Sequence, residues 1–197
     1  MNNIIIIDTG CANFFSLKKS IQSLKYSVKI SSNISEILSA KKIFLPGVGA
    51  INTAIKYLNK RNLIPIIKNI TVPILGICLG MQLFFGDSQE NGFYSALNII
   101  PESIVKIKNK KFSLPHMGWN KIFFEKKNIL FKNINTETRF YFLHSYCALL
   151  NKYTIAVTKY GHFFSAAVQK ENFFGVQFHP EKSGKDGQKL IKNFLEL

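Results

Sequence analysis

A cysteine between two glycines, Gly76-Ile77-Cys78-Leu79-Gly80, is the pattern in this chain best suited to covalent chemistry. It follows an apolar run at 72–77 and opens a segment with helical character at 78–85. A tight turn from strand to helix strains the backbone of a nucleophile, and flanking glycines leave room for that turn. The dipole of the helix favours a thiolate at its amino end. We predict that Cys78 is a nucleophile; an inert cysteine in a glycine-rich turn is the alternative for these five residues alone.

A nucleophilic cysteine needs a base, and the base needs a group that orients it. Among the four histidines, His179 ends a strand-like segment and is followed by Pro180-Glu181. Proline holds the histidine in a loop at the edge of the sheet, where Glu181 can accept its ring N–H. We therefore predict a catalytic triad of Cys78, His179 and Glu181. Taken alone, a histidine such as His179 more commonly lies in a surface loop without a catalytic role.

Acyl transfer also needs N–H donors for a tetrahedral oxyanion. The amide of Leu79, directly after the nucleophile, is the first candidate because it begins the helix. The second is the segment Pro46-Gly47-Val48-Gly49, whose glycines allow the backbone to flip and present the amide of Val48 or Gly49. An ordinary turn between strand and helix is the alternative for this segment.

The sequence favours neither a metal nor a cofactor. Its three cysteines, Cys11, Cys78 and Cys147, are an odd number and include no Cys-x-x-Cys pair, so neither a zinc site nor a disulfide framework is indicated. No glycine-rich phosphate-binding loop precedes Ser183-Gly184-Lys185, and no dinucleotide fingerprint follows the first strand.

Alternating strands and helices must position these residues. In the first half, strand-like segments at 4–8, 27–31, 42–45 and 72–77 alternate with helical ones at 14–24, 34–38, 51–58 and 63–69. In the second half, strand-like segments follow one another at 103–107, 122–125, 140–143, 154–160, 164–170 and 173–177, before a closing helix at 184–196. We predict one α/β domain over residues 1–197. It has a central, mainly parallel sheet flanked by helices, with additional antiparallel strands in the second half.

Composition excludes several classes of protein. The chain has 197 residues, of which 47% are hydrophobic, and this excludes a disordered protein. No apolar run is long enough to span a bilayer and no secretory signal opens the chain, so we expect a cytoplasmic protein. The net charge of +15 comes from scattered lysines with only two arginines, Arg61 and Arg139, which disfavours nucleic acid as a partner.

Three motifs together resemble the triad-type, or class I, glutamine amidotransferases. They are Pro46-Gly47-Val48-Gly49, Gly76-Ile77-Cys78-Leu79-Gly80-Met81-Gln82 and His179-Pro180-Glu181. Further segments look like the glutaminase subunit of imidazole glycerol phosphate synthase. They are Asp8-Thr9-Gly10-Cys11-Ala12-Asn13, Leu114-Pro115-His116-Met117-Gly118-Trp119-Asn120 and His144-Ser145-Tyr146. The resemblance runs from Ile4 to Leu197 with consistent spacing.

The resemblance implies a function as well as a fold. A class I glutamine amidotransferase domain would hydrolyse L-glutamine through the triad. Its ammonia would pass to a (β/α)₈-barrel cyclase subunit in a heterodimer that serves histidine biosynthesis. By the same resemblance, the residues that contact glutamine are Gln82, Glu90, Ser145 and Tyr146. The residues that meet the barrel are Asn13, His116, Met117 and Trp119, although Trp119 could instead pack in the core.

The chain departs from the family pattern at two places. The segment between Gln82 and Gly92, which contains Glu90, is one residue shorter than in the family. The stretch Tyr94-Ser95-Ala96-Leu97-Asn98 lacks a glycine that is expected before Ile99. Two other functions stay open at this point: a cysteine hydrolase of a different kind, such as a peptidase or an amidotransferase of another pathway, and a basic binding module with a degenerate site.

Overall fold

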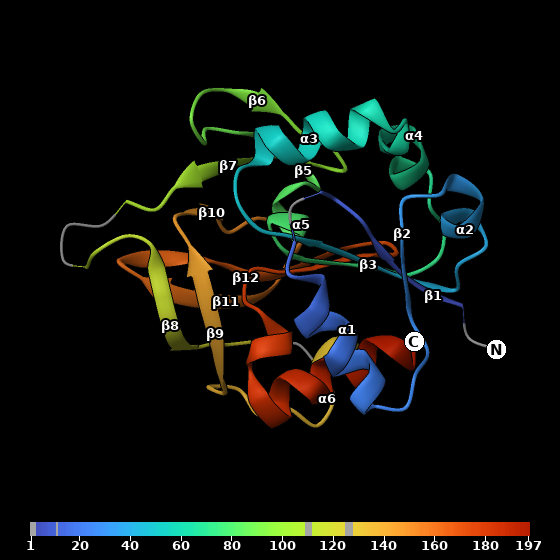
Figure 1. Cartoon of the computed structure of the whole chain (residues 1–197). Coiled ribbons are helices and arrows are strands. Elements are labelled where there is room, and N and C mark those ends of the chain that lie inside the picture. Colours follow the sequence, from blue (N-terminus) through green and yellow to red (C-terminus); the bar gives the residue numbers. More distant parts are fainter. Residues whose placement is uncertain (1–2, 11, 109–111, 125–127) are drawn as a thin grey trace.

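The computed structural model describes residues 3–10, 12–108, 112–124 and 128–197. Cys11 therefore lies outside the described residues. A seven-stranded sheet forms the centre (Figure 1), with the strand order β11-β12-β13-β4-β3-β1-β2. Its strands are β1 (Ile4–Ile7), β2 (Lys29–Ser31), β3 (Lys42–Gly47), β4 (Ile74–Cys78), β11 (Thr154–Tyr160), β12 (His162–Lys170) and β13 (Phe173–Val176). The five strands from β13 to β2 are parallel, and β11 and β12 extend the sheet in antiparallel fashion.

Helices cover both faces of this sheet (Figure 1). Helices α1 (Phe14–Ser23) and α6 (Gly184–Leu195) pack on one face, where Leu17, Ile21 and Phe194 join a core with Phe44. Helices α2 (Ile34–Leu38), α3 (Ile51–Lys60) and α4 (Leu63–Lys68) cover the other face. Strands β1, β3 and β4 are buried along nearly their whole length, as parallel strands between two helical layers must be. No helix built from the described residues reaches the length and hydropathy that spanning a bilayer requires.

Smaller elements stand beside the main sheet. A four-stranded sheet has the order β10-β7-β5-β6. It consists of β5 (Phe85–Ser88), β6 (Tyr94–Ser95), β7 (Ile100–Lys106) and β10 (Tyr146–Ala148). Strands β8 (His116–Lys121) and β9 (Arg139–His144) form a separate antiparallel pair. Short helical turns complete the chain: α5 (Leu79–Gln82), η1 (Ile129–Phe131) and η2 (Pro180–Lys182).

The α/β architecture predicted from the sequence is confirmed. Strands β5, β6, β8 and β10 were not predicted, and two predicted segments have a different structure. The helix predicted at 78–85 ends at Gln82, and Phe85 already begins β5. The strand predicted at 122–125 is wrong: the strand ends at Lys121, Phe123 forms only an isolated bridge to Val157, and residue 125 is outside the described residues. In the stretch that lacks the expected glycine, Asn98 has a φ of 52°, and asparagine tolerates this left-handed conformation better than most residues.

Candidate active site

Cys78 occupies a strained turn at the carboxyl end of the central strand β4. Its φ and ψ are 54° and −110°, a conformation that residues other than glycine rarely adopt. The turn requires close backbone contacts: a Cβ atom on Gly80 would meet the Leu45 carbonyl oxygen at 1.6 Å, and one on Gly76 would meet the Gly80 backbone at 2.7 Å. The predicted elbow is therefore present, and glycine is the residue that its geometry allows on both sides of the nucleophile.

The neighbouring strand β13 brings His179 to this turn. Strand β13 pairs in parallel with β4, and Val176 lies beside Ile77. The strand therefore ends next to Cys78, and the residues that follow it pass beside the cysteine. The His179 amide donates to the Tyr141 carbonyl oxygen at 2.8 Å, which fixes the loop to β9. The ring Nδ1 lies 2.8 Å from Glu181 Oε1, and both side chains are about 5% exposed or less. The predicted His179 and Glu181 are thus a buried hydrogen-bonded pair.

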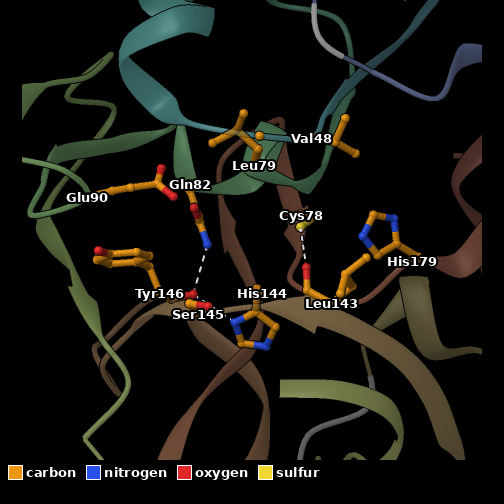
Figure 2. A pocket seen from close by; sticks show the side chains of 11 residues that line it. Val48, Cys78, Leu79, Gln82, Glu90, Leu143, His144, Ser145, Tyr146 and His179 are labelled. Atoms are coloured by element: carbon orange, nitrogen blue, oxygen red, sulfur yellow. Dashed lines mark hydrogen bonds between the residues drawn. The ribbon is translucent and has the colours of Figure 1, made fainter. Parts of the chain in front are cut away.

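The ring of His179 faces Cys78 (Figure 2). Burial lowers the pKa of His179. The negative charge and polar side chain of Cys78, and then those of Glu181, outweigh this effect and raise the pKa to about 10. The ring Nε2 is buried and has no well-aligned hydrogen bond among the described residues. Its attraction to the sulfur is therefore mainly electrostatic. An imidazolium next to a cysteine favours the thiolate, the reactive form of the nucleophile.

A small pocket opens in front of the cysteine (Figure 2). Its volume is about 120 Å³, well below the roughly 300–1,000 Å³ of pockets that hold drug-sized ligands. Its lining includes all the residues predicted for the oxyanion site and for glutamine binding, with the nucleophile and its base: Val48, Gly49, Cys78, Leu79, Gln82, Glu90, Ser145, Tyr146 and His179. Leu143 and His144 complete the lining. Leu143 was missed in the sequence, whereas His144 was singled out only as part of the segment His144-Ser145-Tyr146, with no role in the pocket. A pocket of this size fits a single amino acid better than a segment of peptide.

The predicted oxyanion donors come from two elements. Leu79 is the first residue of α5, where helical amides have no acceptor within the helix. Gly47 pairs with Cys78 in the β3–β4 register, so the following residues Val48 and Gly49 pass beside the nucleophile. Gly49 has a φ of 85°, which glycine adopts without strain.

The predicted glutamine contacts differ in how they are held. Gln82 Nε2 donates to the Tyr146 carbonyl oxygen at 2.9 Å, which joins α5 to the chain that carries Ser145. Glu90 lines the pocket, but its Oε2 accepts from the Ile51 amide at 2.9 Å. Helix α3 has no side-chain cap of its own at Ala50, so this carboxylate satisfies one of its free amides.

The residues predicted to meet a partner divide into exposed and buried ones. Met117 and Trp119 are 66% and 54% exposed, which excludes the alternative that Trp119 packs in the core. Asn13 is exposed as well and accepts from the Ser16 amide at the start of α1. His116 is only 2% exposed, so the prediction that it contacts a partner directly is corrected. Alternation along β8 explains this difference, since Met117 and Trp119 share the face opposite to His116.

His116 instead pairs with His144 beneath the pocket. His144 Nδ1 lies 2.8 Å from the Tyr146 carbonyl oxygen, and His144 Nε2 lies 3.0 Å from His116 Nδ1. Because a carbonyl only accepts, His144 carries its proton on Nδ1 and His116 must then donate from Nδ1. Burial lowers the pKa of His116 to about 4; burial and His116 lower that of His144 to about 3. Both rings are neutral at pH 7.

This pair predicts that acid destabilises the fold. Below the ordinary pKa of about 6.5, the unfolded chain binds protons that the folded His116 and His144 do not. Their stabilisation is complete above that pH and is lost as pH falls toward 4 and 3. Each histidine should lower the free energy of unfolding by up to about 1.4 kcal/mol per pH unit. Urea denaturation between about pH 7 and pH 5 measures this slope.

The variant His116→Gln removes one of the two groups and should give a shallower slope. His162→Gln, which removes a histidine outside the pair, is the matched control and should keep the slope of the unmodified protein. An unchanged slope in His116→Gln would mean that another group causes the acid sensitivity.

Cys147, the other cysteine that the structure describes, is not a second nucleophile. Burial raises the pKa of Cys147 to about 12, so this thiol stays protonated at neutral pH. Within the described ranges, no cluster of three or more His, Cys, Asp or Glu side chains could hold a metal ion.

The chain is similar to known proteins along nearly its whole length. The family described as "Glutamine amidotransferase class-I" matches residues 5–197. The imidazole glycerol phosphate synthase subunit HisH of Buchnera aphidicola subsp. Acyrthosiphon pisum is 51% identical over 98% of this chain and 99% of its own. The protein of that name from Salmonella typhimurium is 48% identical over 99% of this chain and all of its own.

Solved structures share the fold at lower identity. A protein described as glutamine amidotransferase superposes with a TM-score of 0.75 at 14% identity, covering 98% of this chain and 97% of its own. PurLQS from Thermotoga maritima gives a TM-score of 0.67 at 16% identity, over 98% and 97% of the two chains. At such identities the agreement concerns the fold alone.

Proposed function

Because this chain belongs to the class-I glutamine amidotransferase family, we propose that it is the glutaminase subunit of an imidazole glycerol phosphate synthase. It would hydrolyse L-glutamine to glutamate and pass the ammonia to a (β/α)₈-barrel cyclase subunit, which forms imidazole glycerol phosphate and aminoimidazole carboxamide ribonucleotide. The observation that carries the proposal is the buried His179–Glu181 pair facing Cys78 across a small pocket. The relatives of about 50% identity that bear this name support the choice of pathway.

The proposed reaction begins at the Cys78 sulfur. The thiolate attacks the side-chain amide carbon of glutamine, and the developing oxyanion receives N–H groups from Leu79 and from the loop of Val48 and Gly49. His179 gives its Nε2 proton to the departing ammonia, which leaves a glutamyl thioester on Cys78. His179 then takes a proton from water, which attacks the thioester and releases glutamate. Glu181 keeps the ring in the orientation that both proton transfers need.

Binding of glutamine is assigned to the remaining residues of the pocket. Gln82 and the backbone of Ser145 and Tyr146 would receive the α-amino and α-carboxylate groups, which lie at the end of the substrate away from the bond that breaks. Glu90 would attract the ammonium group while it caps α3. A peptidase finds less support, because the pocket of about 120 Å³ gives little room for the residues on either side of a peptide bond.

Docking of the cyclase would involve the exposed Met117 and Trp119 of β8, together with Asn13. Strand β9 pairs with β8 residue by residue and carries Leu143 and His144 into the pocket. A partner that moves β8 would therefore act on the pocket through a hydrogen-bonded neighbour. We infer that partner binding is coupled to glutamine hydrolysis.

The test of this proposal is partner-dependent glutaminase activity. The chain alone is expected to be a poor glutaminase, because a loop with two glycines can hold its amide turned away from the oxyanion. A missing oxyanion donor costs about 10²- to 10³-fold in rate. Glutamate release is measured for the chain alone, with the cyclase, and with the cyclase and its ribonucleotide substrate. A rise of about that size in the third mixture is expected; equal rates in all three would favour a free-standing hydrolase.

A further inference from the structure

A buried glutamine, Gln177, joins the nucleophile to the substrate pocket. It follows β13 directly and its exposed fraction is 0%. Its Nε2 lies 3.7 Å from the Cys78 sulfur, within the range of a hydrogen bond to sulfur. Its Oε1 accepts from Gln82 Nε2 at 3.0 Å. One side chain therefore contacts both the reacting atom and a residue assigned to glutamine binding.

The hydrogen-bond network fixes which end of the Gln177 amide faces the sulfur. The Tyr146 carbonyl oxygen can only accept, and it lies 2.9 Å from Gln82 Nε2. The nitrogen of Gln82 is thereby held on this side, and its second N–H points to Gln177. Gln177 must accept this N–H with its oxygen, because two amide nitrogens would repel each other. Its own nitrogen then faces Cys78.

The sulfur thus lies between a hydrogen-bond acceptor, which favours the thiol, and a hydrogen-bond donor, which favours the thiolate. In the thiol form, its S–H can donate to the Leu143 carbonyl oxygen, 3.7 Å away (Figure 2). The thiolate has no proton to donate and instead accepts the N–H of Gln177. Hydrogen bonds to a charged group are roughly twice as strong as those between neutral groups, so this contact favours ionisation.

We propose that Gln177 is a catalytic residue that stabilises and aims the Cys78 thiolate, and that it also holds Gln82 in place for glutamine. The inference rests on the proposed glutaminase function. No proton leaves Gln177: its N–H bond supports the sulfur until the sulfur lone pair forms the bond to the glutamine carbon. Stabilisation by a hydrogen bond also makes the thiolate a weaker nucleophile, which gives the proposal a distinctive signature.

Two variants separate the two contacts. Gln177→Glu keeps an oxygen for Gln82 but replaces the donor to the sulfur by an acceptor, whereas Gln177→Met removes both contacts at similar volume. Alkylation of Cys78 by iodoacetamide is followed against pH, and the labelled peptide is quantified by mass spectrometry. In both variants the midpoint of the profile should move up by about one pH unit or more. At pH above the midpoint, Gln177→Met should react faster than the unmodified protein.

Turnover in the complex with the cyclase adds a second measurement. The kcat for glutamine hydrolysis at neutral pH should fall about three- to tenfold in both variants. A smaller fraction of Cys78 is then thiolate, but each thiolate is a stronger nucleophile, and this partly offsets the loss. The KM for glutamine should rise in Gln177→Met and change little in Gln177→Glu, which still holds Gln82. Gln169→Met in the neighbouring strand β12 is the control, because its amide bonds to Asn128 and the Glu171 carbonyl oxygen.

An unshifted alkylation profile in Gln177→Met would overturn the proposal and leave Gln177 with a packing role. If Gln177→Glu fails to fold, the result for Gln177→Met is sufficient to test the proposal. Ammonia-dependent activity of the complex then shows that Gln177→Met is folded and docked. The alkylation measurement needs no glutamine. A protein that shows the shift but hydrolyses no glutamine would therefore contradict the proposed function and not the contact.

Discussion

Replacing Cys78 by alanine is expected to abolish glutamine-dependent synthesis while the cyclase in the complex still uses free ammonia. The reason is that only the glutaminase half of the reaction needs the thiolate, and loss of a nucleophile in a triad lowers the rate by about 10⁴-fold or more. The complex is assayed for product formation with glutamine and, separately, with an ammonium salt. Cys78→Ser, which keeps a hydroxyl in the same place, should be almost as inactive.

Cys147→Ala is the matched control, since Cys147 is also buried but lies on β10, outside the pocket lining. It should keep both activities, and we expect the same of a replacement at Cys11, which is outside the described residues. Loss of both activities in Cys78→Ala would show that the strained turn fails to form without the cysteine, and that Cys78 has a structural role.

Replacing His179 by alanine should be nearly as severe as replacing Cys78, because members of a triad act as a unit. Glu181→Gln should retain roughly 10- to 100-fold more activity than His179→Ala. The oxygen of the glutamine side chain can still accept a hydrogen bond from the Nδ1–H, as Glu181 Oε1 now does at 2.8 Å. It no longer supplies the negative charge that raises the pKa of His179.

The pH dependence distinguishes these roles. Because Glu181 helps to raise the pKa of His179, Glu181→Gln should move the alkaline limit of glutaminase activity to lower pH. Substantial glutaminase activity in His179→Ala would assign the base elsewhere. His144 and His116 are poor replacements, since their facing nitrogens bond to each other and His144 Nδ1 is held by Tyr146.

The parts of the fold that could be predicted are those in which burial requires a recognisable pattern of apolar residues or glycines in the sequence. Strands β1, β3 and β4 are continuous apolar runs because helices cover both of their faces. The elbow could be predicted because a backbone with positive φ at Cys78, packed against Leu45, admits only glycine at Gly80. At these positions the fold demands a particular type of residue, and that residue type can be recognised in the sequence alone.

Other parts depend on partners that are distant in the sequence. Strand β8 contains a glycine and several polar residues, and it is a strand because β9 pairs with it over its whole length. Glu90 caps α3 from 39 residues away, which no spacing in the sequence indicates. Gln177 reads as one more residue of a strand pattern, and only the three-dimensional network shows which way its amide points.

The position of β13 in the central sheet affects when a newly made chain can become active. Strand β4 lies between β3, which precedes it, and β13, which is synthesised about 100 residues later. While the ribosome is still making the second half, Cys78 exists without its base and without Gln177. We therefore expect a nascent chain, or one ended by a premature stop codon before β13, to release no ammonia from cellular glutamine. The strand order thus makes completion of translation a precondition for consumption of the substrate.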